Sequence, residues 1–407
     1  MRNLTILVLL ALTVPPILAT KPATTQMVTV EQLEQFLSAS HGEKDGKLAN
    51  QIADMKLTER LSDAKLTGLE EELSGSKSRE ALLALADESA FLDLPAVDIP
   101  SSRAPDPAAQ AALLAKAVDY VNKTVAKLPD FYATKTSISF AGTPTVISHD
   151  LHRAIPSLAH AGYQRLAAIG TSSITVLYRN GQDAYDDNKK RLENDCGYSG
   201  MSSGTGEFGQ VLALVPVIVA QGSVVWSHWE QGNAEPQAVF RYSAMLPFQD
   251  YLRCPGEMNI PPGPYEYHGE IAINPVDGSI PRVTNALRLL IDWDDSGPQM
   301  NGGDIMVKYG PVEIGGTTYI CPVRSVFLGL QPAFTASPSW RENFDHGFGL
   351  AEDPIFDGLD DVSFGQYHLF RAEVRIRPGI NAAPESAPPT STPPTAQPKI
   401  TPVPPQN

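Results

Sequence analysis

The chain has 407 residues, 42% of them hydrophobic and 19% charged, which is enough apolar material for a sizeable core. Asp and Glu number 46 against 31 Lys and Arg, so the formal net charge is −15. A phosphate-binding surface needs clustered basic residues, and after position 191 the only lysines are Lys308 and Lys399, so nucleic acid is not an expected partner.

Residues 1–19 have the pattern of a signal peptide. Arg2 supplies a positive start, Leu4 to Val14 form an apolar run, and Ala19 is a small residue suited to a cleavage point. The run is shorter than the roughly 20 residues that span a bilayer. We therefore expect a chain that is exported to the periplasm or cell envelope and is soluble from Thr20 onward. A permanent membrane anchor is the alternative.

Residues 20–100 are predicted to form a helical module. Thr29 and Gln32 make a capping box, and apolar residues continue at helical spacings as far as Leu85. The charges of this segment fit a solvated helical face. A proline-rich break between Leu94 and Pro107 separates the module from the rest of the chain.

Residues 105–381 are predicted to form an incomplete β-barrel with packed helices. Asp106-Pro107 starts a helix that runs from Ala108 to about Lys127. A second helical or mixed segment is expected at 210–219, and Asn180-Gly181 is a strong hairpin signal. Consecutive hairpins without long crossovers favour an α+β fold with a curved antiparallel sheet. The expected strands cover residues 131–140, 173–179, 224–229, 238–245, 265–274, 279–290, 304–309, 317–330 and 372–377.

Residues 382–407 are predicted to be a disordered tail, because nine of these 26 residues are proline and the others are mostly small or polar. Such a tail could bind an envelope protein, or it could have no partner. Three cysteines lie after the signal peptide. Cys254 and Cys321 each lie on an apparent strand next to a proline and form the candidate disulfide, whereas three buried unpaired thiols, Cys196 included, are the alternative.

Two glycine-rich segments imitate catalytic motifs. Residues 204–209 fit GxGxxG, and residues 200–204 fit GxSxG with Ser202 at the serine position. Both motifs need a hydrophobic strand leading into the loop, but residues 189–195 are polar. A glycine-serine loop explains both segments better, so no catalytic residue is assigned. An exported serine hydrolase that uses Ser202 remains the alternative.

Two acidic segments could supply oxygen ligands to calcium. Residues 292–297 begin like a calcium loop, but Gly303 stands where an EF-hand has its bidentate Glu. The second segment contains Asp353, Asp357, Asp360 and Asp361. Solvated turns use Asp equally readily, and the histidines show no zinc-binding spacing, so neither a metal nor a cofactor is predicted.

The second half of the chain resembles a known family. Residues 265–275, the Asp277-Gly278 turn and Ile280-Pro281-Arg282 are similar to the repeated strands of bacterial lipoprotein-sorting proteins, which have the incomplete barrel of the outer-membrane lipoprotein carrier. Residues 307–316 and 319–323 look like stretches of uncharacterised exported bacterial proteins of similar layout. The carrier-like resemblance implies a concave apolar cavity for acyl chains and no chemistry.

The favoured hypothesis is therefore a non-enzymatic envelope protein that binds a lipid, a lipoprotein or another apolar ligand in its half-barrel. The helices at 108–127 and 210–219 would cover the inner face of the sheet. A structural scaffold without a ligand is a further alternative, and ordinary core packing is the alternative role for each aromatic residue. The candidate ligand-binding residues are Trp226, Trp229, Phe240, Tyr242, Tyr265 and Tyr267.

Overall fold

The computed structural model describes residues 26–142, 145–146, 166–185, 207–232, 235–247, 264–290, 299–332 and 354–370. All of these residues belong to one compact unit. The predicted signal peptide, the strand at 372–377 and the Pro-rich tail lie outside the described residues. Within the described part of the chain, no helix is both long enough and apolar enough to cross a membrane.

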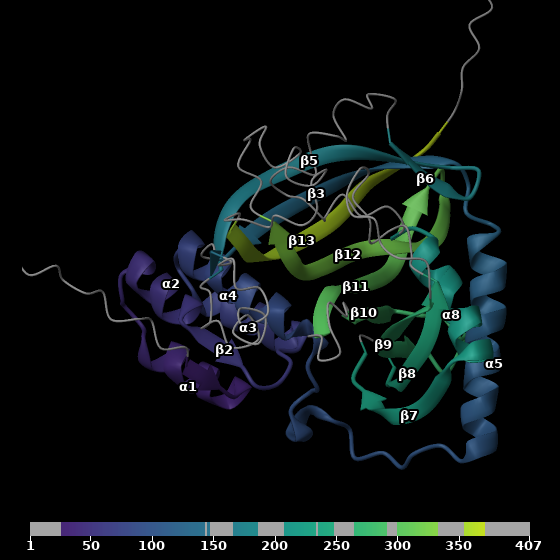
Figure 1. Cartoon of the computed structure of the whole chain (residues 1–407), viewed down its shortest axis with the longest axis horizontal. Helices are drawn as coiled ribbons and strands as arrows, with labels where there is room; N and C mark the ends of the chain where they lie inside the picture. Colours follow the sequence, from purple (N-terminus) through teal and green to yellow (C-terminus); the bar gives the residue numbers. More distant parts are fainter. Residues whose placement is uncertain are drawn as a thin grey trace, which may run out of the picture. The chain divides into compact units, whose positions relative to one another are not determined.

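The N-terminal module contains the helices α1 (Val30–Ala39), α2 (Asp45–Ala53), α3 (Asp63–Glu72) and α4 (Ser76–Glu88), then the short turns η1 (Ser89–Phe91) and η2 (Ala96–Asp98) (Figure 1). The predicted capping box is confirmed, because the Thr29 side chain accepts from the backbone N–H of Gln32 at 3.2 Å. The module has an apolar core of its own, to which α1 contributes Leu33 and α4 contributes Leu82.

One part of the helical prediction was wrong. Met55–Leu57 forms a strand, β2, that pairs in parallel with β1 (Gln26–Val28). Met55 and Leu57 are both buried, and a spacing of two residues fits one face of a strand. The short apolar pattern was compatible with either structure, and pairing with β1 decided between them.

The rest of the compact unit is built on an open 11-stranded antiparallel sheet, which confirms the predicted α+β class. The order β6-β5-β3-β13-β12-β11-β10-β9-β8-β7 begins and ends on different strands, and the sheet curves without closing (Figure 1). The strands are β3 (Phe131–Ala141), β4 (Thr145–Val146), β5 (Ala167–Arg179), β6 (Gln182–Tyr185), β7 (Ser223–Glu230), β8 (Gln237–Pro247), β9 (Pro264–Ile273), β10 (Arg282–Leu290), β11 (Gln299–Ile314), β12 (Thr317–Pro332) and β13 (Pro354–Leu369).

Strand β13 was not anticipated from the sequence. Its Asp and Gly residues suggested a turn, yet the strand pairs with β12 on one side and β3 on the other, so its backbone is hydrogen-bonded along both edges. Turn chemistry was easier to predict. Asn180 and Gly181 have φ angles of 53° and 79°, as the predicted two-residue hairpin between β5 and β6 requires.

Two helices and the N-terminal module pack on opposite faces of the sheet. Helices α5 (Pro107–Val125) and α8 (Gln210–Gln221) contribute Val121 and Val215 to one core with residues such as Phe240; we call this side the inner face (Figure 1). On the other side, the outer face, Ala84 of α4 packs with Phe140 and Leu359. The predicted helices at 108–127 and 210–219 are thus confirmed, and both lie against the inner face.

Candidate functional site

The six aromatic residues predicted to bind a ligand all belong to the core on the inner face. Phe240, Tyr242 and Tyr267 are buried members of this core, and Trp226, Trp229 and Tyr265 are partly buried and pack against it. They come from the adjacent strands β7, β8 and β9, where alternate residues point to one face. In β7 a register shift between Trp226 and His228 brings Trp229 to the same face as Trp226. The structure therefore brings together residues that are up to about forty positions apart in the sequence.

Tyr242 and Tyr267 are buried inside the core. The Tyr242 hydroxyl donates to the carbonyl oxygen of Thr284 and lies within 2.9 Å of Asn285 Oδ1, two strands away. Gly269 stands opposite Tyr242 in β9, and a Cβ atom at this glycine would overlap the Thr284 carbonyl oxygen. Tyr267 is fully buried. Ordinary core packing, the alternative noted from the sequence, describes these two side chains and Phe240.

The tryptophans lie at the margin of this core. The Trp226 ring lies edge-on to Trp229, with centroids 5.1 Å apart, and edge-on to Phe240 at 5.5 Å. Trp229 also donates its indole N–H to the backbone carbonyl of Arg103 at 3.0 Å. Because this donor is already bound to the chain, the Trp229 ring offers an apolar surface to anything that comes against it.

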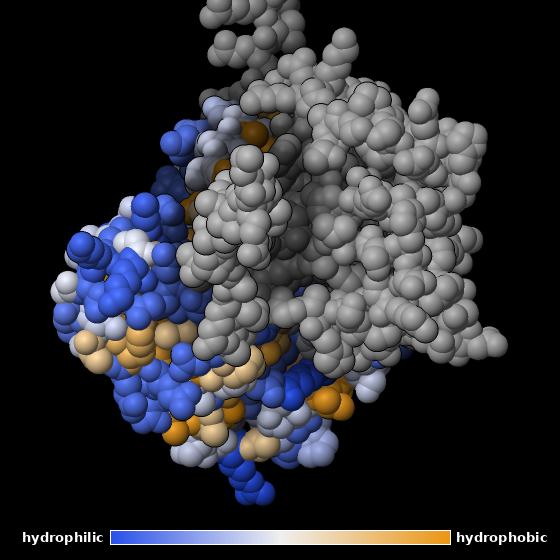
Figure 2. Space-filling model, turned by 60° about the vertical axis from the view of Figure 1, so that its left-hand side comes forward, coloured by the Kyte–Doolittle hydropathy of each residue, from blue (hydrophilic) through white to orange (hydrophobic). Residues whose placement is uncertain are grey.

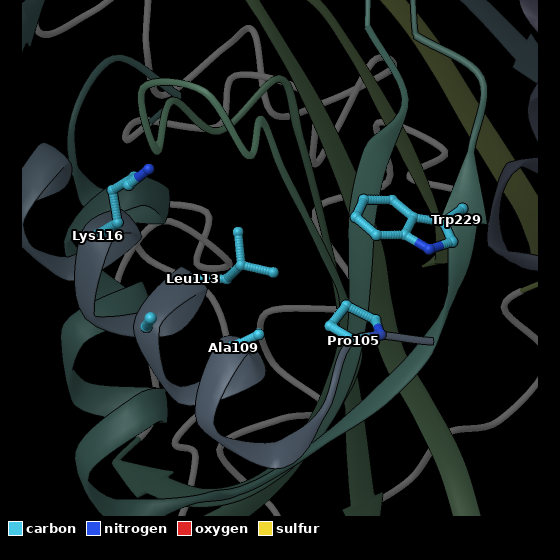
Figure 3. Close-up of a pocket in the computed structure, with 6 residues that line it drawn as sticks. Pro105, Ala109, Leu113, Lys116 and Trp229 are labelled. Atoms are coloured by element: carbon cyan, nitrogen blue, oxygen red, sulfur yellow. The ribbon is translucent and has the colours of Figure 1, made fainter. Parts of the chain in front are cut away.

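A shallow apolar pocket of about 320 Å³ opens beside Trp229 (Figure 3). Its other lining residues come from the start of α5 and from the segment just before it: Pro105, Ala109, Ala112, Leu113 and Lys116. The Lys116 ammonium donates to the carbonyl oxygens of Pro275 and Val276 at 2.9 and 3.2 Å, which ties α5 to the turn between β9 and β10. This volume lies at the lower end of the range for ligand sites, about 300–1,000 Å³.

A buried ion pair fixes the start of α8. Lys135 of β3 lies 2.8 Å from Glu207, and the two side chains are only 1% and 5% exposed. Glu207 directly precedes Phe208 and Gly209, the residues that lead into α8, and its backbone carbonyl accepts from the Tyr309 hydroxyl at 3.0 Å. Phe208 packs edge-on against Phe131 and Phe364. The segment that launches α8 is thus held by charge, by a hydrogen bond and by aromatic packing.

Helix α8 carries no charged residue. Val211, Leu212, Leu214, Val215 and Ile218 are buried in the core of the inner face. Its carboxyl end is followed by Gly222, where a Cβ atom would come within 2.8 Å of the Ile218 carbonyl and 2.9 Å of the Ser243 carbonyl. The helix is therefore an apolar cover joined to β7 through a residue that tolerates no side chain.

Of the acidic segment considered for calcium, the structure describes the side chains of Asp360 and Asp361, which lie on opposite faces of β13, whereas Asp357 lies in β13 with its side chain outside the description. Asp360 faces the inner side, where it accepts from Ser139, and Asp361 faces the outer side, where Arg324 Nε donates to it at 2.6 Å. Alternation along a strand sends neighbouring carboxylates to opposite faces. Among the described residues no group of His, Cys, Asp and Glu is placed to hold a metal ion. Asp353, the loop at 292–297 and Ser202 lie outside the described residues.

The predicted disulfide between Cys254 and Cys321 stays a prediction, because Cys254 lies outside the described residues. Cys321 has a fully buried thiol, packed with Ile314 and Val362. Burial raises the pKa of the Cys321 thiol to about 12. In this structure, Cys321 has the form expected of the alternative, a buried thiol.

No pattern in the sequence predicts the pocket residues or the ion pair between Lys135 and Glu207. Leu113 fits the apolar face of a helix, and nothing local connects Lys135 with Glu207, which are 72 positions apart. A comparison of the chain with protein-family models, with curated proteins and with solved structures finds no match. The resemblance to lipoprotein-sorting proteins therefore stays a prediction.

Proposed function

We propose that this chain is a non-enzymatic exported protein that binds an apolar ligand, such as the acyl chain of a lipid or lipoprotein, between the inner face of its sheet and the helices that cover it. The observation that carries this proposal is the uncharged helix α8, which lies against the inner face of a sheet that is not closed. A ligand that displaced α8 would find apolar surface beneath it, because the buried residues of α8 are in contact with the core there.

The energetics of exchange favour a long chain over a small molecule. Each CH₂ group that moves from water into an apolar site contributes about 0.8 kcal/mol to the binding free energy. A long acyl chain therefore offsets much of the free energy that is lost when α8 leaves the inner face. The pocket beside Trp229 is the natural place for an acyl chain to enter, since it is lined by apolar atoms of α5 and β7 and opens to the surface. No metal or nucleotide is needed for such binding.

The test uses a fluorescent fatty-acyl probe with the mature protein, titrated to saturation. Leu113→Trp fills the pocket, so we expect at least a tenfold weaker affinity, whereas Val97→Trp should leave the affinity unchanged because Val97 is 87% exposed and does not line the pocket. Trp226→Glu should also weaken binding, because it places a charge at the edge of the core.

Two results would contradict the proposal. A folded protein that shows no saturable binding of the probe would leave the scaffold as the better description. Esterase activity that disappears in Ser202→Ala would favour the hydrolase instead. In the proposed binding protein, Ser202→Ala leaves probe binding unchanged.

A further inference from the structure

The N-terminal module meets the outer face of the sheet through several ion pairs. Arg60 of the module lies 2.8 Å from Glu230 of β7, and Arg241 of β8 pairs with Asp93. Two small apolar clusters lie between these ion pairs, one with Ala84 beside Leu359 and the other with Ala90 beside Val326. Figure 2, turned toward the side of α1 to α4, shows mostly hydrophilic residues on the described surface there. Polar interfaces of this kind are typical of parts that move relative to one another.

Asp87, in the last turn of α4, is the most buried carboxylate of this interface. Its side chain is 2% exposed, and its Oδ1 accepts from Arg324 Nη2 of β12. Its Oδ2 is buried and has no hydrogen-bond partner among the described residues. The same Arg324 guanidinium donates through Nε to Asp361 of β13 at 2.6 Å. One guanidinium therefore serves two carboxylates.

The charges around Asp87 do not balance. Besides Arg324 and Asp361, the cluster contains Lys308 of β11, which pairs with Asp63 of α3 at the rim of the interface. Arg282 of β10 also acts on Asp63 and Lys308, and with Arg60 it is paired with Glu230 and Glu270. Four cations thus face five carboxylates, an excess of one negative charge when all are ionised. Glu88, next to Asp87 in the chain, does not change this balance because it is paired with Lys56 at 2.8 Å. Burial of the ionised form in such a cluster is unfavourable, and protonation of one carboxylate removes the excess.

The most buried member is the one expected to take the proton. Burial raises the pKa of Asp87 to about 8; the neighbouring Asp361 adds to this rise, and Arg324 opposes it. The pKa values of Asp63, Glu230 and Glu270 are instead lowered by their Lys and Arg partners, which outweigh the opposing effect of burial. These three carboxylates are therefore ionised throughout the neutral range.

We propose that Asp87 takes up a proton when the N-terminal module docks on the outer face, so that docking weakens as the medium becomes alkaline. A carboxyl group whose pKa rises on docking stabilises the docked state. This stabilisation is complete below the pKa of the undocked state, near 3.8, and is lost as the pH rises to the pKa of the docked state. The docking constant should fall about tenfold per pH unit and level off above about pH 8. Carboxylates whose pKa values are lowered change the docking constant only below about pH 4.5.

Single-molecule energy transfer on the full mature chain tests this. Dyes are attached through non-natural amino acids at Glu71 in α3 and Ser172 in β5, both exposed, and low urea is added so that docked and undocked molecules coexist. In the wild type, the docking constant should fall about tenfold per pH unit between pH 6 and 8. Asp87→Asn, which cannot titrate, should remain docked with no pH dependence in this range. Asp93→Asn removes an exposed carboxylate of the same interface and should keep the wild-type slope.

Two further variants keep the test decisive if Asp87→Asn does not fold. Asp361→Asn removes the second carboxylate from Arg324, so this guanidinium stabilises ionised Asp87 more strongly. The pH at which the docking constant levels off should therefore be lower. His228→Gln removes the histidine that lies 3.7 Å from Glu230 and should leave the slope unchanged. The proposal is overturned if the wild type shows no slope, if no undocked species appears before the sheet unfolds, if Asp361→Asn leaves the levelling-off in place, or if His228→Gln abolishes the slope.

Discussion

Lys135 and Glu207 form an ion pair of 2.8 Å inside the half-barrel, between strand β3 and the turn that leads into α8. Each side chain is almost completely removed from water, and Ser325 Oγ lies 3.4 Å from the same Glu207 oxygen. The pair therefore links the segment that leads into α8 to strand β3. In the sheet, β13 and β12 lie between β3 and β11. Substitution of either Lys135 or Glu207 should therefore change the stability of the protein.

We expect Lys135→Met to destabilise the protein by about 3–5 kcal/mol, because Glu207 is then left as an unpaired buried charge. The double variant Lys135→Met/Glu207→Met should regain most of this loss, since an apolar pair needs no compensating charge. Urea unfolding of the two variants and the wild type measures the difference. Equal stabilities of the single and double variants would show that Glu207 finds another partner.

Gly269→Ala should cost roughly 1–3 kcal/mol or more, because overpacking against backbone cannot be relieved by a rotamer change. The new Cβ atom would overlap the Thr284 carbonyl oxygen, which also accepts from Tyr242. Gly170→Ala in β5 is the matched control. No atom lies within 4 Å of a Cβ atom there, so this change should be neutral or stabilising by about 0.4–1 kcal/mol. Thermal unfolding of both variants gives the comparison, and equal effects would contradict the close approach of β9 and β10.

Asp106→Ala should destabilise the protein by about 1 kcal/mol, because it removes the cap of α5. Asp106 accepts from the backbone N–H of Ala109 at 2.9 Å. Asp119→Ala removes an exposed carboxylate from the same helix, where its only described ion pair is with Lys123, and should cost no more than about 0.5 kcal/mol. Denaturant midpoints distinguish the two. A larger effect at Asp119 would mean that the cap does not limit the stability of α5.

The Cys321 thiol should resist alkylation in the native protein and react once the protein is unfolded. Burial raises its pKa to about 12, so thiolate is scarce at pH 8 as well as inaccessible. Stability should fall as the pH rises from about 9 toward 12, because the unfolded thiol ionises first. Peptide mass spectrometry after iodoacetamide treatment, without reductant, identifies the residue. If unfolding in denaturant left Cys321 unlabelled, the thiol would be blocked, as in a disulfide with Cys254.

Local pattern alone was enough to predict α5, the hairpin at Asn180-Gly181, the capping box of α1 and the open antiparallel sheet. Each of these depends on neighbours in the sequence: a side chain that caps the helix it precedes, a turn that needs positive φ, or an alternation that gives a strand one apolar face. The aromatic candidates of β7 to β9 share a face only because of a register shift between Trp226 and His228, which strict alternation in the predicted strand does not contain.

Only the tertiary structure decided which of these residues are core and which lie at a surface. Tyr242 and Trp229 look alike in an alternating strand, but Tyr242 is 4% exposed and hydrogen-bonded across the sheet, whereas Trp229 lines a pocket with residues of α5. Asp360 and Asp361 look like one acidic turn in the sequence, but β13 places them on opposite faces. Burial and charge pairing are properties of contacts between distant segments, such as Lys135 with Glu207 or Asp87 with Arg324, and no periodicity in the chain encodes which segments will meet.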